Sequence, residues 1–501
     1  MEAGRTSRLG KMGVLPVQGA IAKAGYETMR RASMWLGLFV GLWGLGSGSL
    51  AARGADTPAP VALHPDNPRY FLFRGRPAFL ITSGEHYGAV LNADLDFIPY
   101  LDELRSRGFN LTRTFSGTYH EIAGSFQIRE NTLAPRADRY LGPWARSQTP
   151  GALDGGPRFD LDTWDIAYFR RLKEFVVAAS ARGIVVEYVL FCPFYDDALW
   201  AVNPLNARNN ISGVGTMSRT DVYTLKHPGM VARHEAFVRK AVTELHGFDN
   251  VYFEICNEPY FGGVTLDWQA RIARVIGETE AKLGGPRHLI AQNIANGKAR
   301  ITDPNPAVGL FNFHYATPPD VVALNAGLKK ALGDDETGFR GNDDRPYRTE
   351  AWDFLIAGGG TFSNLDYSYT VRHPDGTAQV EAPTPGGGGP ALRKQLAILK
   401  GFLDGFDFVR MAPDPALIRG GVPAKATAQA LSTPGKAYAI HVNGGTRAKL
   451  ELELPPGRYR AEWVNTHTGA VDKAEDLDHG GQVALESPAY QEDVALRVVA
   501  R

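Results

Sequence analysis

Val251-Tyr252-Phe253-Glu254-Ile255-Cys256-Asn257-Glu258-Pro259 is the clearest strand signal in this 501-residue sequence. The stretch is apolar and rich in β-branched and aromatic residues, which predicts a buried strand. Proline cannot donate a ladder hydrogen bond and biases its predecessor towards an extended conformation, so we expect the strand to end with Glu258 at its rim. Glu258 can then project into a cleft above the sheet. Taken alone, the same residue is equally compatible with an ion-paired or helix-capping carboxylate.

Strand-like and helix-like segments alternate on both sides of this stretch. Strands are predicted at residues 79–82, 110–115, 184–191, 251–258, 288–292, 309–315, 347–350 and 361–365, and helices at 94–107, 161–182, 230–246, 266–283, 319–332, 352–357 and 392–402. Each of the eight strands is followed by helical or long-loop material. This α/β pattern predicts a (β/α)8 TIM barrel over residues 62–410, with an active site at the carboxyl ends of its strands.

The pattern changes beyond Pro413. Short apolar strands follow one another, separated by turn signals such as Asn443-Gly444-Gly445 and Pro455-Pro456-Gly457. Closely spaced strands with Gly and Pro turns are typical of all-β domains. We therefore expect residues 414–501 to form a small β-sandwich domain.

The first 55 residues have the order of a secretory signal. Arg30-Arg31 precede the apolar run 34–45, and the small-residue stretch 46–55 follows it. The apolar run is short for a membrane span, so we interpret residues 1–55 as a signal peptide or leader of a secreted or periplasmic protein. An N-terminal membrane anchor that is never cleaved remains the alternative.

Composition limits the classes of partner. The 54 basic and 54 acidic residues give a formal net charge of zero, which provides no electrostatic reason to expect nucleic acid or an anionic membrane. Aromatic residues make up 10% of the chain, and many have polar or Gly-rich neighbours, as suits a carbohydrate partner. Cys192 and Cys256 are expected to be buried free thiols. The sequence does not indicate an oligomeric state.

Two long loops, 116–159 and 193–227, interrupt the barrel pattern. Loops of this length inside a compact domain are usually functional, so we place both over the cleft. Trp144 and Trp200 lie within them and are candidate platforms on which a sugar ring could stack.

Chemically useful side chains gather at the predicted strand ends. These are Glu85 and His86 on the first strand, Arg113 on the second, Asn257 and Glu258 on the fourth, His314 and Tyr315 on the sixth, and Glu350 on the seventh. Carboxylates on the fourth and seventh strands would face each other across the barrel mouth. Glycoside hydrolysis needs such a pair, one to protonate the leaving oxygen and one to attack or stabilise the anomeric carbon.

This arrangement resembles the clan A retaining glycoside hydrolases, of which the family 5 cellulase-like enzymes are the nearest type. The resemblance rests on Asn257-Glu258-Pro259, His314-Tyr315 and Glu350, and on the order of elements over roughly residues 65–410; the tail resembles the small β-domain that often follows such barrels. It implies hydrolysis of β-glycosidic bonds in a poly- or oligosaccharide by retaining double displacement. Glu258 would be the acid/base and Glu350 the nucleophile.

The resemblance also implies roles for neighbouring residues. Asn257 would bind the sugar 2-hydroxyl, Tyr315 and Arg113 would keep the nucleophile ionised, and His314 would line the cleavage subsite. Apart from the resemblance, Glu85 and His86 at the first strand end are candidate sugar contacts. An arginine lowers the pKa of a neighbouring carboxylate, whereas a partly desolvated Glu258 should keep its proton. Such enzymes usually carry a tryptophan at the eighth strand end. Here Tyr367, or Trp352, would take its place.

Two other interpretations stay open. The chain could be a non-catalytic carbohydrate-binding barrel, in which the two carboxylates would not face each other. It could also be a metal-dependent hydrolase, with a site drawn from Glu85, His86, His120, Glu121 and His314. No His-x-His or His-Glu-x-x-His spacing supports the latter, so we expect neither metal nor cofactor. The acidic groups 334–336 and 343–344 lack the spacing of a calcium loop and are interpreted as a solvated acidic turn.

Overall fold

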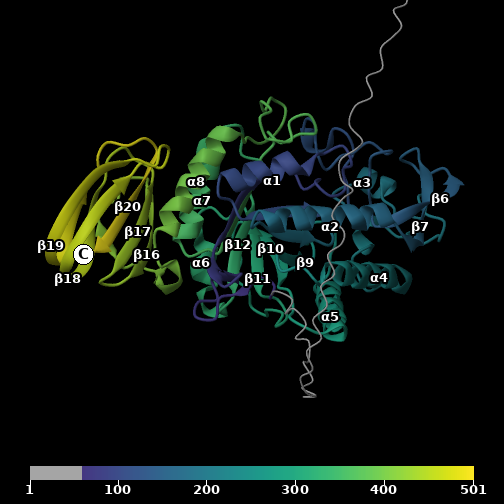
Figure 1. The fold of residues 1–501 in the computed structure, drawn as a ribbon, viewed down its shortest axis with the longest axis horizontal. Coiled ribbons are helices and arrows are strands. Elements are labelled where there is room, and N and C mark those ends of the chain that lie inside the picture. Colours follow the sequence, from purple (N-terminus) through teal and green to yellow (C-terminus); the bar gives the residue numbers. More distant parts are fainter. Residues whose placement is uncertain (1–58) are drawn as a thin grey trace, which may run out of the picture. The chain divides into compact units, whose positions relative to one another are not determined.

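The computed structural model describes residues 59–501, so the leader predicted over residues 1–55 lies outside the described part of the chain. Within residues 59–501, no helix combines the length and the apolarity that crossing a bilayer requires. The described residues belong to one compact unit that contains both a barrel and an antiparallel sheet domain (Figure 1).

Eight parallel strands form the barrel. They are β4 (Leu80–Gly84), β5 (Leu111–Phe115), β8 (Val185–Val189), β9 (Val251–Glu254), β10 (Ile290–Asn296), β11 (Leu310–His314), β12 (Ala331–Glu336) and β13 (Thr361–Leu365). Their hydrogen-bonded order is β4-β13-β12-β11-β10-β9-β8-β5. The Asn110 side chain joins the two ends of this series, because its amide accepts from Ile81 N at 2.9 Å and donates to Phe79 O at 2.8 Å. The predicted (β/α)8 barrel is confirmed.

The helices of the barrel are α1 (Phe97–Ser106), α2 (Ile166–Ala181), α3 (Asp197–Val202), α4 (Pro228–Leu245), α5 (Leu266–Leu283), α6 (Asp320–Leu324), α7 (Asp344–Ile356) and α8 (Pro390–Asp404). Their sequences carry the expected local signals. Asp165 caps α2 by accepting from Ala167 N at 2.8 Å, and the buried side chains of that helix recur every three or four residues. The apolar stripe of each amphipathic helix thus packs inward, and the strand ends are free to carry function.

The amino end of the barrel is closed. A small antiparallel sheet of β1 (Ala62–Leu63), β2 (Phe71–Phe73) and β3 (Arg76–Ala78) contributes Val61 and Phe71 to a core shared with the first residues of the barrel strands. The loop after β5 contains a hairpin, β6 (Trp144–Pro150) and β7 (Pro157–Trp164). With its amino end plugged, the barrel is accessible from the carboxyl ends of its strands.

The seventh strand differs from the prediction. Residues 319–332, predicted to be helical, form α6 and a 3-10 turn that ends at Leu328, and β12 then supplies the seventh strand. Residues 347–350, predicted to be that strand, lie inside α7, and residues 352–357 largely continue the same helix. All of residues 347–356 are buried, so α7 shows no amphipathic period from which a helix could be read.

The acidic group 334–336 is the end of a buried strand, not a solvated turn. Asp334, Asp335 and Glu336 are all less than a tenth exposed, and Asp335 lies 3.3 Å from the Arg113 guanidinium. The residues that pair with these carboxyl groups come from distant parts of the chain. The interpretation of these residues as a solvated acidic turn is therefore wrong.

The second domain is a seven-stranded antiparallel sheet. Its strands are β14 (Ala412–Pro413), β15 (Ile418–Gly420), β16 (Thr427–Thr433), β17 (Ala437–Asn443), β18 (Lys449–Val464), β19 (Val471–Glu486) and β20 (Asp493–Ala500). Pro455-Pro456-Gly457, predicted to be a turn between two strands, lies inside β18, which continues through it with a shift of register. Leu452 from one half and Trp463 from the other enter a common core, which gives the domain a sandwich-like interior.

The β-domain docks on α7 through a buried polar network. His441 on β17 lies 2.8 Å from Asp353 Oδ1 and 3.1 Å from Asp493 Oδ2, and Arg348 donates to Asp493 Oδ1 at 2.7 Å. The Trp352 ring stacks on His441 with a centroid distance of 5.3 Å. Trp352 is therefore part of this domain contact, and its predicted place as a sugar platform is wrong.

This network predicts a loss of stability at alkaline pH. Burial alone would lower the pKa of His441, but hydrogen bonds and charge from Asp353 and Asp493 outweigh it and raise the pKa to about 9. A raised pKa in the folded state stabilises the fold fully below the unfolded value of about 6.5, and this contribution disappears as the pH rises through 9. The pKa difference corresponds to about 3 kcal/mol.

Urea unfolding at pH 6 and pH 9.5 measures the effect. We expect the wild type to unfold at a lower urea concentration at pH 9.5 than at pH 6. The His441→Gln variant has no titrating group at this position, so it should lose most of this difference. His373→Gln changes an exposed histidine and serves as the control. Equal falls in the wild type and in His441→Gln would contradict the assignment.

Candidate active site

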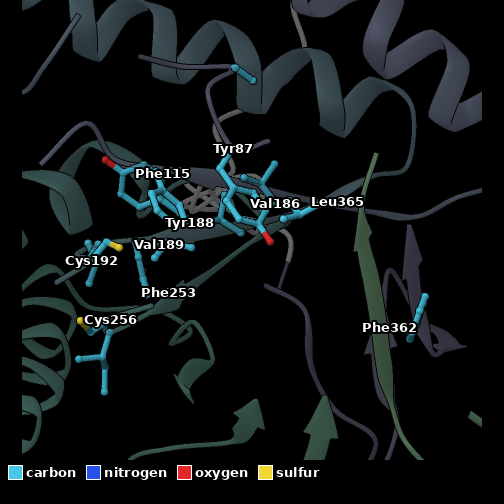
Figure 2. Packing of buried hydrophobic residues seen from close by; sticks show 14 of the residues in the cluster. Tyr87, Phe115, Val186, Tyr188, Val189, Cys192, Phe253, Cys256, Phe362 and Leu365 are labelled. Carbon is cyan, nitrogen blue, oxygen red and sulfur yellow. The ribbon is translucent and has the colours of Figure 1, made fainter. Parts of the chain in front are cut away.

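A cavity of about 360 Å³ opens at the carboxyl ends of the barrel strands. It is lined by His86, Tyr87, Phe115, Tyr119, Glu121, Phe126, Leu133, Tyr195, Asn257, Glu258, Phe261, Asn296, Tyr315, Glu336 and Phe339. Part of its wall is packed core, since the Tyr87 and Phe115 rings stack with a centroid distance of 4.8 Å. Figure 2 shows both side chains among the buried hydrophobic residues. The lining is thus largely aromatic, with a few carboxylate and amide groups.

Glu258 lies in a turn just beyond β9, which ends at Glu254 rather than at Glu258 as predicted. Its φ is 37°, in the left-handed region that non-glycine residues rarely adopt. Tyr195 and Tyr260 donate to its carboxylate at 2.5 and 3.3 Å, and His314 Nδ1 lies 3.2 Å from Oε1. These contacts hold the strained residue with its carboxylate in the cavity.

Glu336 is the second carboxylate of the pair, and sequence analysis did not identify it. It ends β12, and its carboxylate accepts from Tyr87 at 2.9 Å, Tyr315 at 3.2 Å and Arg113 at 3.3 Å. A carboxylate can accept all three bonds, and one of the donors is positively charged. One oxygen of Glu336 and one of Glu258 lie within 4.8 Å of each other.

Glu350 does not end a strand and does not line the cavity. It lies on α7, where it accepts from Thr337 Oγ1 at 3.1 Å and from Arg340 at 3.2 Å. Burial raises its pKa to about 7. The predicted position of Glu350 opposite Glu258 is wrong, because the strand that ends opposite Glu258 is β12.

Arg113 lies beneath the two facing carboxylates and is fully buried. It donates to Glu254 at 2.7 Å and to the Asn257 side chain at 2.8 Å, besides its contacts with Asp335 and Glu336. The Asn257 amide in turn donates to Tyr195 at 3.0 Å. Arg113 thus contacts a carboxylate at the end of the seventh strand, as the resemblance implied for the arginine, although that carboxylate belongs to Glu336 and not to Glu350.

His314 connects the two facing carboxylates to the barrel interior. Its Nδ1 is 3.2 Å from Glu258 and 3.5 Å from Glu336, and its Nε2 is 3.4 Å from Asp335. Burial raises the pKa of Glu258, but the hydrogen bond and charge of His314, with the Tyr195 hydroxyl, lower it by more. The expectation that a partly desolvated Glu258 keeps its proton is therefore wrong.

The remaining predicted residues divide between cavity and framework. His86, Asn257 and Tyr315 line the cavity. Glu85 does not; its carboxylate accepts from Ala89 N at 2.9 Å and Thr132 Oγ1 at 2.5 Å, so it anchors a loop. Tyr367 lies behind the cavity wall, with its ring 5.8 Å from that of His86.

Several residues predicted to be near the cleft are core residues. Trp144 and Trp200 are buried in the barrel's main apolar cluster and are not sugar platforms. Cys192 and Cys256 are free and buried, as predicted, and Figure 2 shows them in the packed interior. The long loops instead contribute Tyr119, Glu121, Phe126 and Tyr195 to the cavity, none of which carries a local sequence signal beyond its place in a long loop.

The hypothetical five-residue metal group is not brought together. His120 packs against the Tyr140 ring at 4.3 Å and does not line the cavity. His86 pairs with Glu121 at 3.4 Å, whereas His314 contacts Glu258 and Glu336. Among the described residues, that last set, with ligand atoms within 4.8 Å of one another, is the group at this cavity with the donors for a metal ion.

No protein-family model matches the sequence, and no curated protein is similar to it. Solved structures do match. A structure described as a glycoside hydrolase is 14% identical, with a TM-score of 0.59 over 89% of this chain and 97% of that one. A family 5 glycoside hydrolase from Bacteroides vulgatus ATCC 8482 is 13% identical, with a TM-score of 0.59 over 88% of this chain and 93% of the other. The chain therefore shares the fold of these glycoside hydrolases, barrel and C-terminal β-domain together.

Proposed function

We propose that this protein is a retaining glycoside hydrolase that cleaves β-glycosidic bonds of an oligo- or polysaccharide, with Glu336 as nucleophile and Glu258 as acid/base. The carrying observation is the approach of their carboxylate oxygens to within 4.8 Å across the cavity. Retaining enzymes hold the two carboxyl groups roughly 5 to 5.5 Å apart, whereas inverting enzymes leave roughly 6.5 to 9.5 Å for a water molecule. The fold shared with glycoside hydrolases supports the same reaction class.

In the first step Glu336 attacks the anomeric carbon and Glu258 protonates the departing glycosidic oxygen, so the C–O bond to the leaving group breaks as the bond to Glu336 forms. In the second step Glu258 takes a proton from water, whose oxygen attacks the same carbon and releases Glu336. Two inversions at that carbon give net retention.

The proximity of the two groups helps Glu258 to change roles. While Glu336 is ionised, its charge disfavours a second negative charge on Glu258, and a bound sugar that displaces water strengthens this repulsion. When Glu336 becomes part of the glycosyl ester, that repulsion ends. The contacts with His314 and Tyr195 then favour the carboxylate form of Glu258, which is the form that accepts a proton from water.

The cavity favours catalysis over simple carbohydrate binding. A non-catalytic barrel would have no reason to place a facing carboxylate opposite Glu258, yet Glu336 occupies that place with three donors directed at it. Export to the periplasm or the exterior is part of the proposal. It is supported by the basic, apolar and small-residue order of residues 30–55.

Glutamine substitutions separate the roles of the three carboxylates. We expect Glu336→Gln to lose turnover of aryl β-glycosides by roughly 10³-fold or more, because no covalent intermediate can form. Glu258→Gln should lose roughly 10²- to 10⁴-fold on unactivated glycosides and less on aryl glycosides whose leaving groups need little protonation. Glu350→Gln should keep activity within about tenfold, since Glu350 lies outside the cavity.

Three measurements complete this test. Circular dichroism shows whether each variant is folded, and NMR of the first-formed product shows whether the anomeric configuration is retained. Wild-type-like turnover in folded Glu336→Gln would contradict the proposal. Loss of wild-type activity in EDTA, restored by a divalent ion, would instead favour a metal-dependent hydrolase built on Glu258, His314 and Glu336.

The pH profile tests the contact between His314 and Glu258. Because Glu258 must be protonated in the first step and its pKa is lowered, kcat/KM should fall as the pH rises through that lowered pKa. Replacing His314 by Asn removes the main group that lowers the pKa, so the alkaline limb should move to higher pH. Tyr315→Phe is the matched control, because Tyr315 contacts Glu336 and not Glu258. An unmoved alkaline limb in His314→Asn would exclude this contact as the cause.

A further inference from the structure

The loop after β5, residues 117–134, crosses the mouth of the barrel and is fixed at the end of β4. Thr132 donates to the buried Glu85 carboxylate at 2.5 Å, and the Asn92 amide donates to Thr132 O at 2.8 Å. Gly88 makes this approach feasible, since a Cβ there would lie 2.1 Å from Thr132 O. The loop is thus held against the first strand by buried polar contacts.

The same loop is also joined to the segment that follows β13. Arg129 N donates to Thr384 Oγ1 at 3.1 Å, and the Arg129 side chain pairs with Glu381 at 3.1 Å. Glu130 forms a further ion pair with Arg372. Exposed ion pairs contribute little to stability, but with the backbone hydrogen bond they define where the loop lies. The loops after the second and eighth strands therefore meet across the top of the first strand.

Phe126 forms a roof over the cavity from the tip of this loop. Its ring lies 5.3 Å from Tyr195, in the loop after β8, and 6.1 Å from Phe339, in the loop after β12. Phe126 and Gln127 both have left-handed backbones, with φ of 53° and 62°. Such residues persist where their surroundings hold them, and here the aromatic contacts on both sides do so. The roof spans the cavity from the third to the seventh strand.

A third carboxylate lies inside the roofed cavity. Glu121 accepts from Asn131 at 2.5 Å and Tyr119 at 3.3 Å, and pairs with His86 at 3.4 Å. Among the described residues that line the cavity there is neither Lys nor Arg. A sugar with its own carboxylate or sulfate would lie beside Glu121, Glu258 and Glu336. No Lys or Arg among these described lining residues would balance its charge. The lining therefore suits an uncharged sugar.

We propose that this cavity is a blind pocket for the single, uncharged sugar at the non-reducing end of a β-glycoside, so that the enzyme acts as an exo-glycosidase. The inference rests on the proposed function and defines its substrate class. The roof and the joined loops obstruct passage of a chain, and about 360 Å³ is at the small end of the roughly 300 to 1,000 Å³ of ligand pockets. The leaving group departs on the Glu258 side, past Phe261 and Asn296.

End-labelled oligosaccharides test the mode of action. β-Linked tetra- to hexasaccharides labelled at the reducing end should lose one sugar at a time, with a monosaccharide as the first unlabelled product. Early products from cleavage in the middle of the chain would overturn the proposal. If neither the oligosaccharides nor aryl β-glycosides are hydrolysed, the proposed function itself fails. If aryl β-glycosides are hydrolysed but the oligosaccharides are cut internally, only the exo assignment fails.

Charge selection is tested with matched aryl glycosides. The aryl β-glycoside of a neutral hexose should have a kcat/KM at least about 100-fold above that of the corresponding uronide, and Glu121→Gln should reduce this ratio by roughly tenfold, because one charge is removed. Glu174→Gln, on the exposed face of α2, is the control. Comparable turnover of both glycosides by the wild type would overturn the charge assignment.

Removing the roof tests its role directly. Phe126→Ala combined with Phe339→Ala should raise KM for a neutral aryl glycoside by roughly 3- to 10-fold, as expected for lost aromatic contact, and should yield internal cleavage products from hexasaccharides. Ile166→Ala removes an exposed apolar side chain that does not line the cavity and should change neither property. Unchanged KM and product pattern in the double variant would overturn the roof assignment.

Discussion

The buried guanidinium of Arg113 is the interaction on which the barrel interior and the candidate site both depend. It joins the second strand to the fourth through Glu254 and to the seventh through Asp335 and Glu336. A charge in this position is costly unless it is paired, and removing one member of such a buried pair typically costs 3 to 5 kcal/mol. The same contacts of Arg113 therefore link three strands inside the barrel and position Glu336, the carboxylate that we propose as nucleophile.

The site gains its geometry from the difference between the two strands that carry the pair. Glu336 is the last residue of its strand, so the sheet ladder and three donors fix it. Glu258 lies in a strained turn beyond its strand and is held by tyrosine and histidine side chains instead. A nucleophile must be rigidly placed, whereas an acid/base must serve two partners, the leaving oxygen and the incoming water. The two environments match these different needs.

Much of this architecture follows from local sequence patterns, and the errors have a common cause. The strand before Glu258 is apolar except for Glu254, so its type could be predicted, although it ends four residues before Glu258. The sequence Ala331-Leu332-Gly333-Asp334-Asp335-Glu336 reads locally as an acidic turn, because the groups that neutralise it, Arg113 and His314, come from other strands. The first half of helix α7, up to residue 351, was missed for a related reason: the β-domain covers the face that would otherwise show a polar stripe. Glu121 and Phe126 belong to a loop whose path is set by contacts with distant segments, and no local pattern encodes those contacts.

The protonation of the interior follows from burial and from the position of Arg113. The Asn312 amide nitrogen lies 2.8 Å from carboxyl oxygens of Glu187, Glu254 and Asp335, yet it carries only two hydrogens. One of its N–H groups is therefore shared between two of these oxygens. Burial, with neighbouring carboxylates, raises the pKa of Glu187 and of Asp335 well above the usual range, while Arg113 offsets burial and lowers the pKa of Glu254. The neutral forms of Glu187 and Asp335 are accordingly favoured, and the Arg113 guanidinium pairs with Glu254 at 2.7 Å and with Glu336 at 3.3 Å. The raised pKa values of Glu187 and Asp335 thus limit the negative charge that the interior places beneath Glu336, the carboxylate that we propose as nucleophile opposite Glu258.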